Sequence, residues 1–403
     1  MKNKTQKIDN ILNYGVEKII DKEHLLDALK GSKKLRIKHG IDPTGDKIHI
    51  GRASQLWKLK DFQDLGHKIV LIIGDFTAQI GDPSDKPEGR KGLEEKEIKK
   101  NMSSYLKQMG KILDIKKTEI RYNSEWFKKI GLDEFLSIAK IFSVQQMIQR
   151  RNFNERWKKE QPITLQEIYY PLLQGYDSKA IKADVELGGY DQLFNLKTGR
   201  DVQRHYGQKP QDIIALQMLS GLDKRKMSTS WGNVVNITDE PNDMFGKLMS
   251  MKDEMMEKYF ELCARMDEKD LKIIKNKLKD KKTNPKDIKE ELALRIVSLY
   301  WGSVAAQKAK QEFQKVFKKK GLPSKMRVFF APRKQYPVLE LLCHLDLTTS
   351  KGEAKRLIQQ GGVKIDNKKI DNFQKIVKVK EGLVIQVGKR KFARLTEKDG
   401  REQ

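Results

Sequence analysis

The chain has 403 residues, of which 38% are hydrophobic and 34% charged, and its formal net charge is +27. This length allows two or three domains, and no apolar run is long enough to predict a membrane-spanning helix. The N-terminal residues lack the apolar core of a secretory signal, and Cys263 and Cys343 are too few for a disulfide framework or a zinc site. We therefore expect a cytoplasmic protein with buried free thiols.

The first half of the chain predicts alternating strands and helices. Residues 35–41 are strand-like, residues 49–65 show a helical pattern that ends at Gly66, and residues 68–75 form an apolar run typical of a buried strand. This order predicts a parallel sheet with right-handed crossovers. Residues from about 94 to 185 are expected to be mainly helical and to interrupt the sheet, before a further strand and turn within 212–223.

The second half changes character twice. From Asn242 to about Lys320 the sequence predicts helices without a strand, and after Tyr336 a helical stretch is followed by short alternating strands. Between Gln307 and Tyr336, ten Lys or Arg stand against one acidic residue, Glu312. A general lysine bias would only solubilise the protein, whereas this local excess favours a polyanionic partner such as nucleic acid.

The segment GIDPTGDKIHIGRA, residues 40–53, joins the first predicted strand to the first long helix. A helix that begins near His49 presents unpaired N–H groups and the positive end of its dipole, which suits a phosphate. Gly51 leaves room for a ligand, Thr44 and His49 can donate hydrogen bonds, and Asp42 can orient a cation or an amine. A capping loop with Asp46 as the N-cap explains the same residues equally well.

Several motifs in order resemble a known family. HIGR, residues 49–52, resembles the HIGH signature of class I aminoacyl-tRNA synthetases, and KMSTS, residues 226–230, resembles their KMSKS loop. The motifs GIDPT, IGDFTAQIGDPS and YYPLLQGYDSKAIKADVELGGYDQLFN, with a small RNA-binding module at the C-terminal end, are similar to those of bacterial tyrosyl-tRNA synthetases. The resemblance covers almost the whole chain.

The resemblance implies an α/β fold in four parts. These are a Rossmann-like parallel-sheet catalytic domain over 1–240 with a helical insertion at about 94–185, an all-helical domain for the anticodon arm over 241–322, a basic linker over 323–336, and a small α+β RNA-binding domain over 337–403. It also implies that L-tyrosine is activated with ATP and Mg²⁺ and then passed to tRNA(Tyr). The resemblance further implies a homodimer formed through the insertion. It implies no tightly bound metal in the protein itself.

The resemblance assigns most of the tyrosine pocket to one helix and two loops. Tyr170, Gln174 and Asp177 stand at i, i+4 and i+7 and therefore share a helix face. Asp177 can accept a hydrogen bond from the phenol, while Tyr170 and Gln174 can hold the amino group. The full predicted set for tyrosine is Gly40, Asp42, Thr77, Asp82, Tyr170, Gln174, Asp177 and Gln192.

ATP and the chemical step are assigned to the motifs in the same way. Glycines at 188 and 189 permit close approach of a nucleoside, Asp191 is placed to hold ribose hydroxyls, and the lysine-rich loop can place cations on the leaving pyrophosphate. The predicted ATP-binding residues are His49, Gly51, Gly189, Asp191 and Lys226. The predicted catalytic residues are Thr44, His49, Gly51, Lys86, Arg90, Lys226 and Ser228.

The predicted RNA contacts of the C-terminal module lie on one short helix. Ser350, Lys351, Lys355 and Arg356 are expected to face phosphates, although a solvated helix explains the same charges.

Four positions depart from the family pattern. Lys38 stands where many members of the family have a pocket tyrosine, and Arg52 replaces the second His of HIGH. Tyr190 replaces a small Ser or Thr, and Thr229 replaces the usual Lys of KMSKS. These departures sustain an alternative, a synthetase-like RNA-binding protein without aminoacylation activity. A tryptophanyl-tRNA synthetase is a second alternative, but Asp177 and the C-terminal module favour tyrosine, because an indole needs no phenol acceptor.

Overall fold

The computed structural model describes residues 4–43, 45–82, 93–227, 232–280, 282–318, 326–388 and 391–396. The chain divides into two compact units, the first made of Met1–Glu240 and Lys247–Gly302, the second of Pro241–Gly246 and Ser303–Gln403. The functional boundaries expected from the sequence at 240, 322 and 336 stay predictions. No helix in these described ranges has both the length and the apolar character that a membrane crossing needs.

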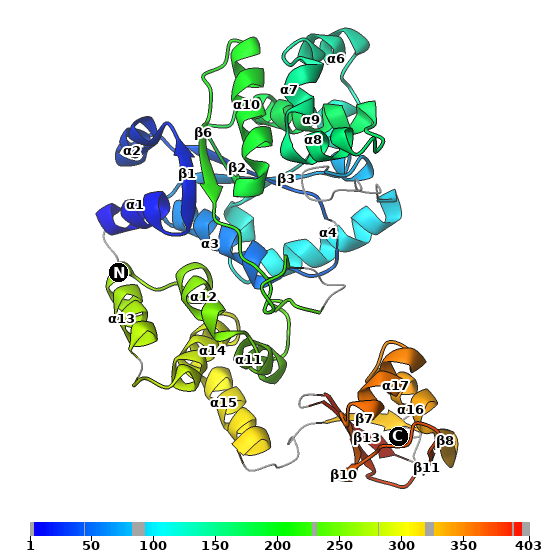
Figure 1. The fold of residues 1–403 in the computed structure, drawn as a ribbon. Helices are drawn as coiled ribbons and strands as arrows, with labels where there is room; N and C mark the ends of the chain where they lie inside the picture. The colour runs from blue at the N-terminus through cyan, green and yellow to red at the C-terminus, as the bar shows by residue number, and fades with distance from the viewer. Residues whose placement is uncertain are drawn as a thin grey trace. The chain divides into compact units, whose positions relative to one another are not determined.

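A six-stranded sheet forms the centre of the first unit, in the order β1-β6-β5-β2-β3-β4 (Figure 1). Strands β2 to β6 run parallel, as the sequence predicts, and the apolar side chains of β3, β5 and β6 are buried because helices cover both faces. The strands are β1 (Val16–Ile20), β2 (Arg36–Ile41), β3 (Lys68–Ile73), β4 (Glu119–Tyr122), β5 (Val185–Gly189) and β6 (Asp212–Leu216).

Two strands differ from the sequence-based expectation. β1 pairs antiparallel with β6, so the sheet is mixed and not purely parallel. β4 lies inside the segment expected to be mainly helical and pairs parallel with β3. Both strands are short, lie at an edge and carry charged residues, so neither has the continuous apolar run that identifies a central strand.

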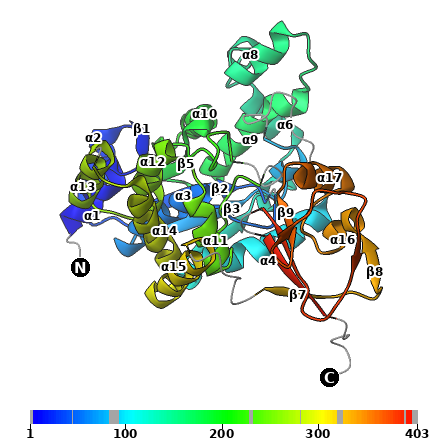
Figure 2. The same ribbon diagram turned by 60° about the horizontal axis from the view of Figure 1, so that its bottom comes forward.

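The helices of the first unit lie on both faces of the sheet, with α3 and α4 on one face and α9 and α10 on the other (Figure 1). In the insertion, α6 and α8 lie away from the strands of the sheet (Figure 2). The helices are α1 (Lys4–Asn13), α2 (Lys22–Lys30), α3 (Ile50–Asp64), α4 (Glu95–Met109), α5 (Ser124–Phe127), α6 (Leu132–Ala139), α7 (Val144–Ile148), α8 (Arg151–Lys158), α9 (Leu165–Ile181) and α10 (Leu193–His205).

From Pro241 to Lys318 the regular elements of the described residues are helices, which confirms the prediction of a helical stretch without a strand. The helices are α11 (Pro241–Met249), α12 (Met256–Cys263), α13 (Glu268–Lys279), α14 (Pro285–Trp301) and α15 (Ser303–Lys318). Just after α12, Arg265 pairs with Asp61 of α3 at 2.7 Å and stacks over Trp57, which attaches this part of the chain to the sheet layer.

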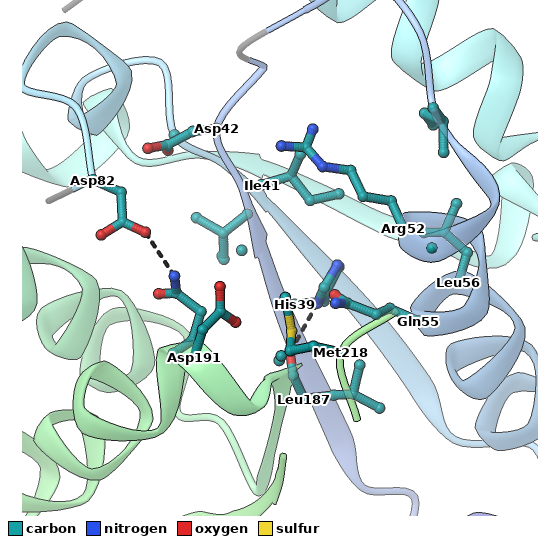
Figure 3. A pocket seen from close by; sticks show the side chains of 18 of the residues that line it. His39, Ile41, Asp42, Arg52, Gln55, Leu56, Asp82, Leu187, Asp191 and Met218 are labelled. Atoms are coloured by element: carbon teal, nitrogen blue, oxygen red, sulfur yellow. Dashed lines mark hydrogen bonds between the residues drawn. The ribbon is translucent and has the colours of Figure 1, made fainter. Parts of the chain in front are cut away.

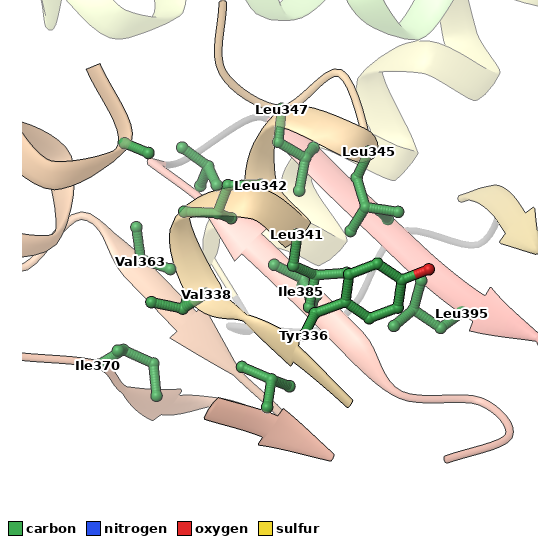
Figure 4. Close-up of a cluster of buried hydrophobic side chains, with 14 of the residues drawn as sticks. Tyr336, Val338, Leu341, Leu342, Leu345, Leu347, Val363, Ile370, Ile385 and Leu395 are labelled. Atoms are coloured by element: carbon green, nitrogen blue, oxygen red, sulfur yellow. The ribbon is translucent and has the colours of Figure 1, made fainter. Parts of the chain in front are cut away.

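The C-terminal residues form a small α+β domain with its own apolar core around Tyr336, Leu341 and Ile385 (Figure 4). Residues 327–330, which the sequence suggested as part of a linker, instead form a strand parallel to β13. The elements are β7 (Arg327–Phe330), β8 (Gln335–Pro337), α16 (Val338–His344), α17 (Lys351–Gln359), β9 (Val363–Ile365), β10 (Lys368–Lys369), β11 (Ile376–Lys378), β12 (Val384–Val387) and β13 (Lys391–Thr396).

Candidate active site

A cavity of about 920 Å³ opens at the carboxyl ends of the parallel strands. From β2 the chain crosses over to β3 on one side, and from β5 it crosses to β6 on the other, so the loops diverge between β2 and β5. Ligands of open α/β sheets bind at such a point. Figure 3 shows Asp42 and Asp82 towards one end of this cavity and His39, Gln55 and Met218 towards the other.

All predicted tyrosine and ATP residues line this one cavity. They come from the ends of β2, β3 and β5, the start of α3, helix α9 and the segment after β6: Gly40, Asp42, His49, Gly51, Thr77, Asp82, Tyr170, Gln174, Asp177, Gly189, Asp191, Gln192 and Lys226. Thr44, Lys86, Arg90 and Ser228 lie outside the described residues, as does Thr229. The individual roles of these residues stay predictions.

At one end of the cavity, which we call the tyrosine end, polar side chains hold one another. Tyr170 donates a hydrogen bond to Asp42 at 2.8 Å, and Thr77 donates to the other oxygen of Asp42 at 3.0 Å. Burial, together with Asp42 and Asp82, raises the pKa of Tyr170, so its hydroxyl keeps its proton and stays a donor. Gln192 donates to Asp82 at 2.7 Å.

Asp177 lies in the wall of the tyrosine end and is almost fully buried. Its Oδ1 accepts a hydrogen bond from the indole N–H of Trp126 at 2.9 Å. Burial raises the pKa of Asp177 to about 7, while Lys38 and the hydrogen bonds from Trp126 and Asn123 act in the opposite direction. The carboxyl group is therefore close to the balance between its protonated and ionised forms at neutral pH.

Lys38, one of the four departures, is completely buried behind this wall. Its ammonium pairs with Glu186 of the neighbouring strand at 2.8 Å and donates to Ser178 Oγ at 2.7 Å and to the carbonyl of Gln174 at 2.8 Å. Lys38 and Glu186 are register partners in β2 and β5, so the sheet itself brings them together. The lysine therefore has polar partners behind the pocket and does not line the cavity, so it does not take the place of a pocket tyrosine.

The other end, which we call the nucleotide end, is built around the start of α3. His49 is the N-cap, because its Nδ1 accepts from the backbone N–H of Arg52 at 3.3 Å; the alternative in which Asp46 caps this helix is wrong. Burial, together with Arg52, lowers the pKa of His49 to about 3. The neutral ring therefore carries its proton on Nε2, the nitrogen that can donate to a phosphate.

Two glycines keep the nucleotide end open. A Cβ at Gly51 would lie 2.9 Å from Met227 Sδ, and one at Gly189 would lie 2.5 Å from Asp191 Oδ1. Arg52 follows in the first turn of α3, where it is hydrogen-bonded to the hydroxyl of Tyr105 in α4 and lines the cavity (Figure 3). The second departure thus places a cation at this end.

The comparisons with known proteins agree with this architecture. Residues 30–318 match the family described as tRNA synthetases class I (W and Y), and residues 340–383 match the S4 domain. The chain belongs to this family of class I tRNA synthetases. The synthetase is 44% identical to a tyrosine–tRNA ligase of Thermotoga maritima, with 96% of each chain covered. It is also 44% identical to tyrosine–tRNA ligase 2 of Clostridium acetobutylicum, over 98% of this chain and 99% of that one.

Solved structures share the fold at lower identity. A truncated mitochondrial tyrosyl-tRNA synthetase of Aspergillus nidulans is 19% identical, with a TM-score of 0.62 over 79% of this chain and 95% of that chain. A tyrosyl-tRNA synthetase of Archaeoglobus fulgidus, solved with L-tyrosine, is 21% identical, with a TM-score of 0.61 over 76% of this chain and 99% of that chain.

Several residues that support the tyrosine end of the synthetase are not among those predicted from the sequence. Trp126, Arg150, Glu186 and Asn195 were not singled out, although each is hydrogen-bonded to a residue of that end or to a residue that supports it. Glu186 and Asn195 flank the GGYDQ motif and share its segment, which was a usable signal. Trp126 and Arg150 lie in the insertion, where no motif marks them.

The predicted RNA contacts lie on α17. Lys351, Lys355 and Arg356 are exposed, and the ammonium of Lys355 lies 4.5 Å from the centre of the Phe373 ring. Ser350 is the N-cap of this helix, since its hydroxyl accepts from the backbone N–H of Glu353 at 3.2 Å. The three cations are therefore available to a polyanion, while Ser350 has a structural role in the helix.

Proposed function

We propose that this protein is a tyrosine–tRNA ligase, which forms tyrosyl-adenylate from L-tyrosine and ATP and then transfers tyrosine to the 3′-terminal adenosine of tRNA(Tyr). One observation carries the proposal: the Asp177 wall and the start of α3 line the same cavity. One end suits a phenol and an amine, and the other suits a nucleotide, so the two substrates meet between them. Tryptophan would leave the buried carboxyl of Asp177 without a phenol partner.

The chemistry requires positioning and charge stabilisation, without a protein nucleophile. The carboxylate of tyrosine attacks the α-phosphorus of ATP and pyrophosphate leaves. Asp82 and Asp42 hold the α-ammonium of tyrosine, and Asp177 accepts the phenol hydrogen bond. His49 Nε2–H and the N–H groups at the start of α3 receive the phosphates, while Lys226 faces the negative charge that develops on the leaving group. Mg²⁺ enters with ATP as part of the substrate complex.

The partners follow from the two units. The exposed cations of α17 bind phosphates of tRNA, and Lys351, Lys355 and Arg356 are the residues proposed to do so. We also propose a homodimer through the insertion, where five large apolar residues are at least half exposed: Leu132, Leu136, Val144, Trp157 and Leu165. The mass of the protein in solution tests the dimer. We place the reaction in the cytoplasm, as the sequence predicts.

The test separates the two steps of the reaction. The wild-type protein should show ATP–pyrophosphate exchange that depends on tyrosine and not on tryptophan, and it should charge tRNA(Tyr). The variant K351A/K355A/R356A should keep the exchange rate and lose charging, with the largest difference from the wild type at low salt, because the phosphate contacts that the variant lacks are weakened by salt in the wild type. A folded wild-type protein without tyrosine-dependent exchange would instead be the RNA-binding protein without aminoacylation activity.

A further inference from the structure

The amide of Asn195 connects the two glutamines of the tyrosine end. Asn195 lies in the first turn of α10 and is completely buried. Its Nδ2 donates to Gln174 Oε1 at 3.0 Å and to Gln192 Oε1 at 2.8 Å. Its Oδ1 accepts from the guanidinium of Arg150 at 3.0 Å. One buried amide thus contacts both glutamines that are predicted to hold tyrosine.

The chemistry at each end of this network fixes the direction of every amide in it. A guanidinium only donates, so the group of Asn195 that faces Arg150 must be the oxygen. The nitrogen of Asn195 then faces the two glutamine oxygens. Each glutamine nitrogen in turn faces a carboxylate, which accepts: Gln192 Nε2 lies 2.7 Å from Asp82, and Gln174 Nε2 lies 3.4 Å from Glu186.

Both branches therefore run from a group that only donates to groups that only accept. If any one amide turned over, it would place donor against donor or oxygen against oxygen in a buried site, where such a mismatch is expensive. The glutamines consequently have one orientation each before tyrosine arrives. This is the pre-organisation that a binding site for a small polar substrate needs.

Arg150 is held firmly in its position. It lies between α7 and α8 of the insertion, is mostly buried, and packs its guanidinium 4.6 Å from the centre of the Phe194 ring and 5.2 Å from that of Phe153. Burial lowers the pKa of Arg150 to about 10, so it stays protonated at neutral pH. The insertion thereby supplies a permanent cation to the hydrogen-bond network between α9 and α10.

We propose that Arg150 and Asn195 are positioning residues for tyrosine, because together they set the direction in which the amides of Gln174 and Gln192 face. They act through the two glutamines and need no contact with tyrosine of their own. The inference rests on the proposed function and on the prediction from the sequence that both glutamines hold tyrosine. It adds that the selectivity of the pocket depends on the insertion as well as on the sheet.

The decisive variant is Asn195→Asp, which keeps the size of the side chain and its contact with Arg150. A carboxylate cannot donate to Gln174 and Gln192, so both glutamines lose their fixed orientation. In tyrosine-dependent exchange, the KM for tyrosine should rise about tenfold or more, while the KM for ATP stays within about twofold. Arg150→Met should act in the same direction, and Arg150→Lys, which is still a donor, should restore part of the effect.

Arg156→Met is the matched control. Arg156 is also a buried arginine of the insertion, but its hydrogen bonds go to Glu167 and to the carbonyl of Pro162, away from the glutamines. It should lower the melting temperature without changing the ratio of the two KM values. If N195D folds, equal changes in both KM values, or no change in either, would overturn the inference. If N195D does not fold, the inference would be overturned by R150K and R150M having the same KM for tyrosine.

Gln192→Ala separates this inference from the proposed site. A higher KM for tyrosine in Q192A, with N195D unchanged, overturns the role of Asn195 alone. No change in either variant overturns the assignment of Gln192 to tyrosine as well.

Discussion

The two ends of the cavity are built by different means. At the tyrosine end, side chains from distant segments fix one another, as in the hydrogen bonds of Tyr170 to Asp42 and of Trp126 to Asp177. At the nucleotide end, backbone does most of the work, through the start of α3 and the glycines that expose it. The first arrangement suits the choice of one amino acid among many, because a buried polar group left unpaired rejects the wrong substrate. The second suits phosphates, which any helix start can receive.

The largest difference between the ends should appear when Asp177 loses its charge. In Asp177→Asn the size of the side chain is kept, but the phenol loses a charged acceptor. We expect the KM for tyrosine to rise roughly 10- to 100-fold while the KM for ATP stays within about twofold. Asp212→Asn is a suitable control, because Asp212 is equally buried but lies at the start of β6, paired with His24. An unchanged affinity for tyrosine in D177N would refute the pocket assignment.

The same difference explains what the sequence could predict. The nucleotide end is built from residues that are close together in the sequence. The end of a strand, a glycine and the start of a helix follow one another in residues 40–53, so their role can be predicted from the sequence. The shared helix face of Tyr170, Gln174 and Asp177 can be predicted for the same reason, because helical spacing places the three residues on one side of the helix. The supports of the tyrosine end are not local. Trp126 is 51 residues from Asp177, and Arg150 is 45 from Asn195.

Lys38 shows most clearly that contacts between distant segments cannot be predicted from the sequence alone. In the sequence it is a cation in the place of an expected pocket tyrosine, and its partner Glu186 is far along the chain. The pairing arises only because β2 lies beside β5, which depends on the order of strands in the sheet. Likewise β1 and β4 escaped prediction because edge strands lack a buried apolar run.

Two glycine variants test the difference between the tyrosine end and the nucleotide end without removing a polar side chain. In Gly74→Ala the new Cβ would lie 1.9 Å from Asp42 Oδ1 and 2.4 Å from Thr77 Oγ1, so the tyrosine end must shift. We expect a rise of about tenfold in the KM for tyrosine. In Gly51→Ala the nearest atom is Met227 Sδ, at the end of a flexible side chain, and His49 Nδ1 follows at 3.1 Å. The KM for ATP should rise by less.

Gly131→Ala serves as the control for both glycines, since nothing lies within 4 Å of its added Cβ. Measuring both KM values for the three variants gives a direct comparison of the two ends. If G74A and G51A raised the same KM, the division of the cavity into two ends would be wrong.

The smallest expected effect is the change in the KM for tyrosine close to pH 7, because only part of the Asp177 carboxyls gain or lose their charge there. Because burial raises the pKa of Asp177 to about 7, its carboxyl is protonated in more acidic solution and then accepts the phenol poorly. The KM for tyrosine should therefore fall as pH rises through about 7, and this slope should be absent in D177N. Burial lowers the pKa of His49 to about 3, so this ring does not titrate in this window, and burial also lowers the pKa of His39.

The stability of the folded protein should fall as pH rises towards 7, whereas the affinity for tyrosine should increase. The folded protein holds the Asp177 proton between about 4 and 7, where the unfolded chain has released it. The folded state thus binds more protons than the unfolded chain in this range. The stabilisation that the protonated Asp177 carboxyl provides is therefore lost as pH rises towards 7. Melting temperatures across this range should fall more steeply for the wild-type protein than for D177N, while tyrosine binds more tightly to the wild-type protein. Parallel melting curves for the two proteins would mean that Asp177 is ionised throughout, as a group fully stabilised by Trp126 and Lys38 would be.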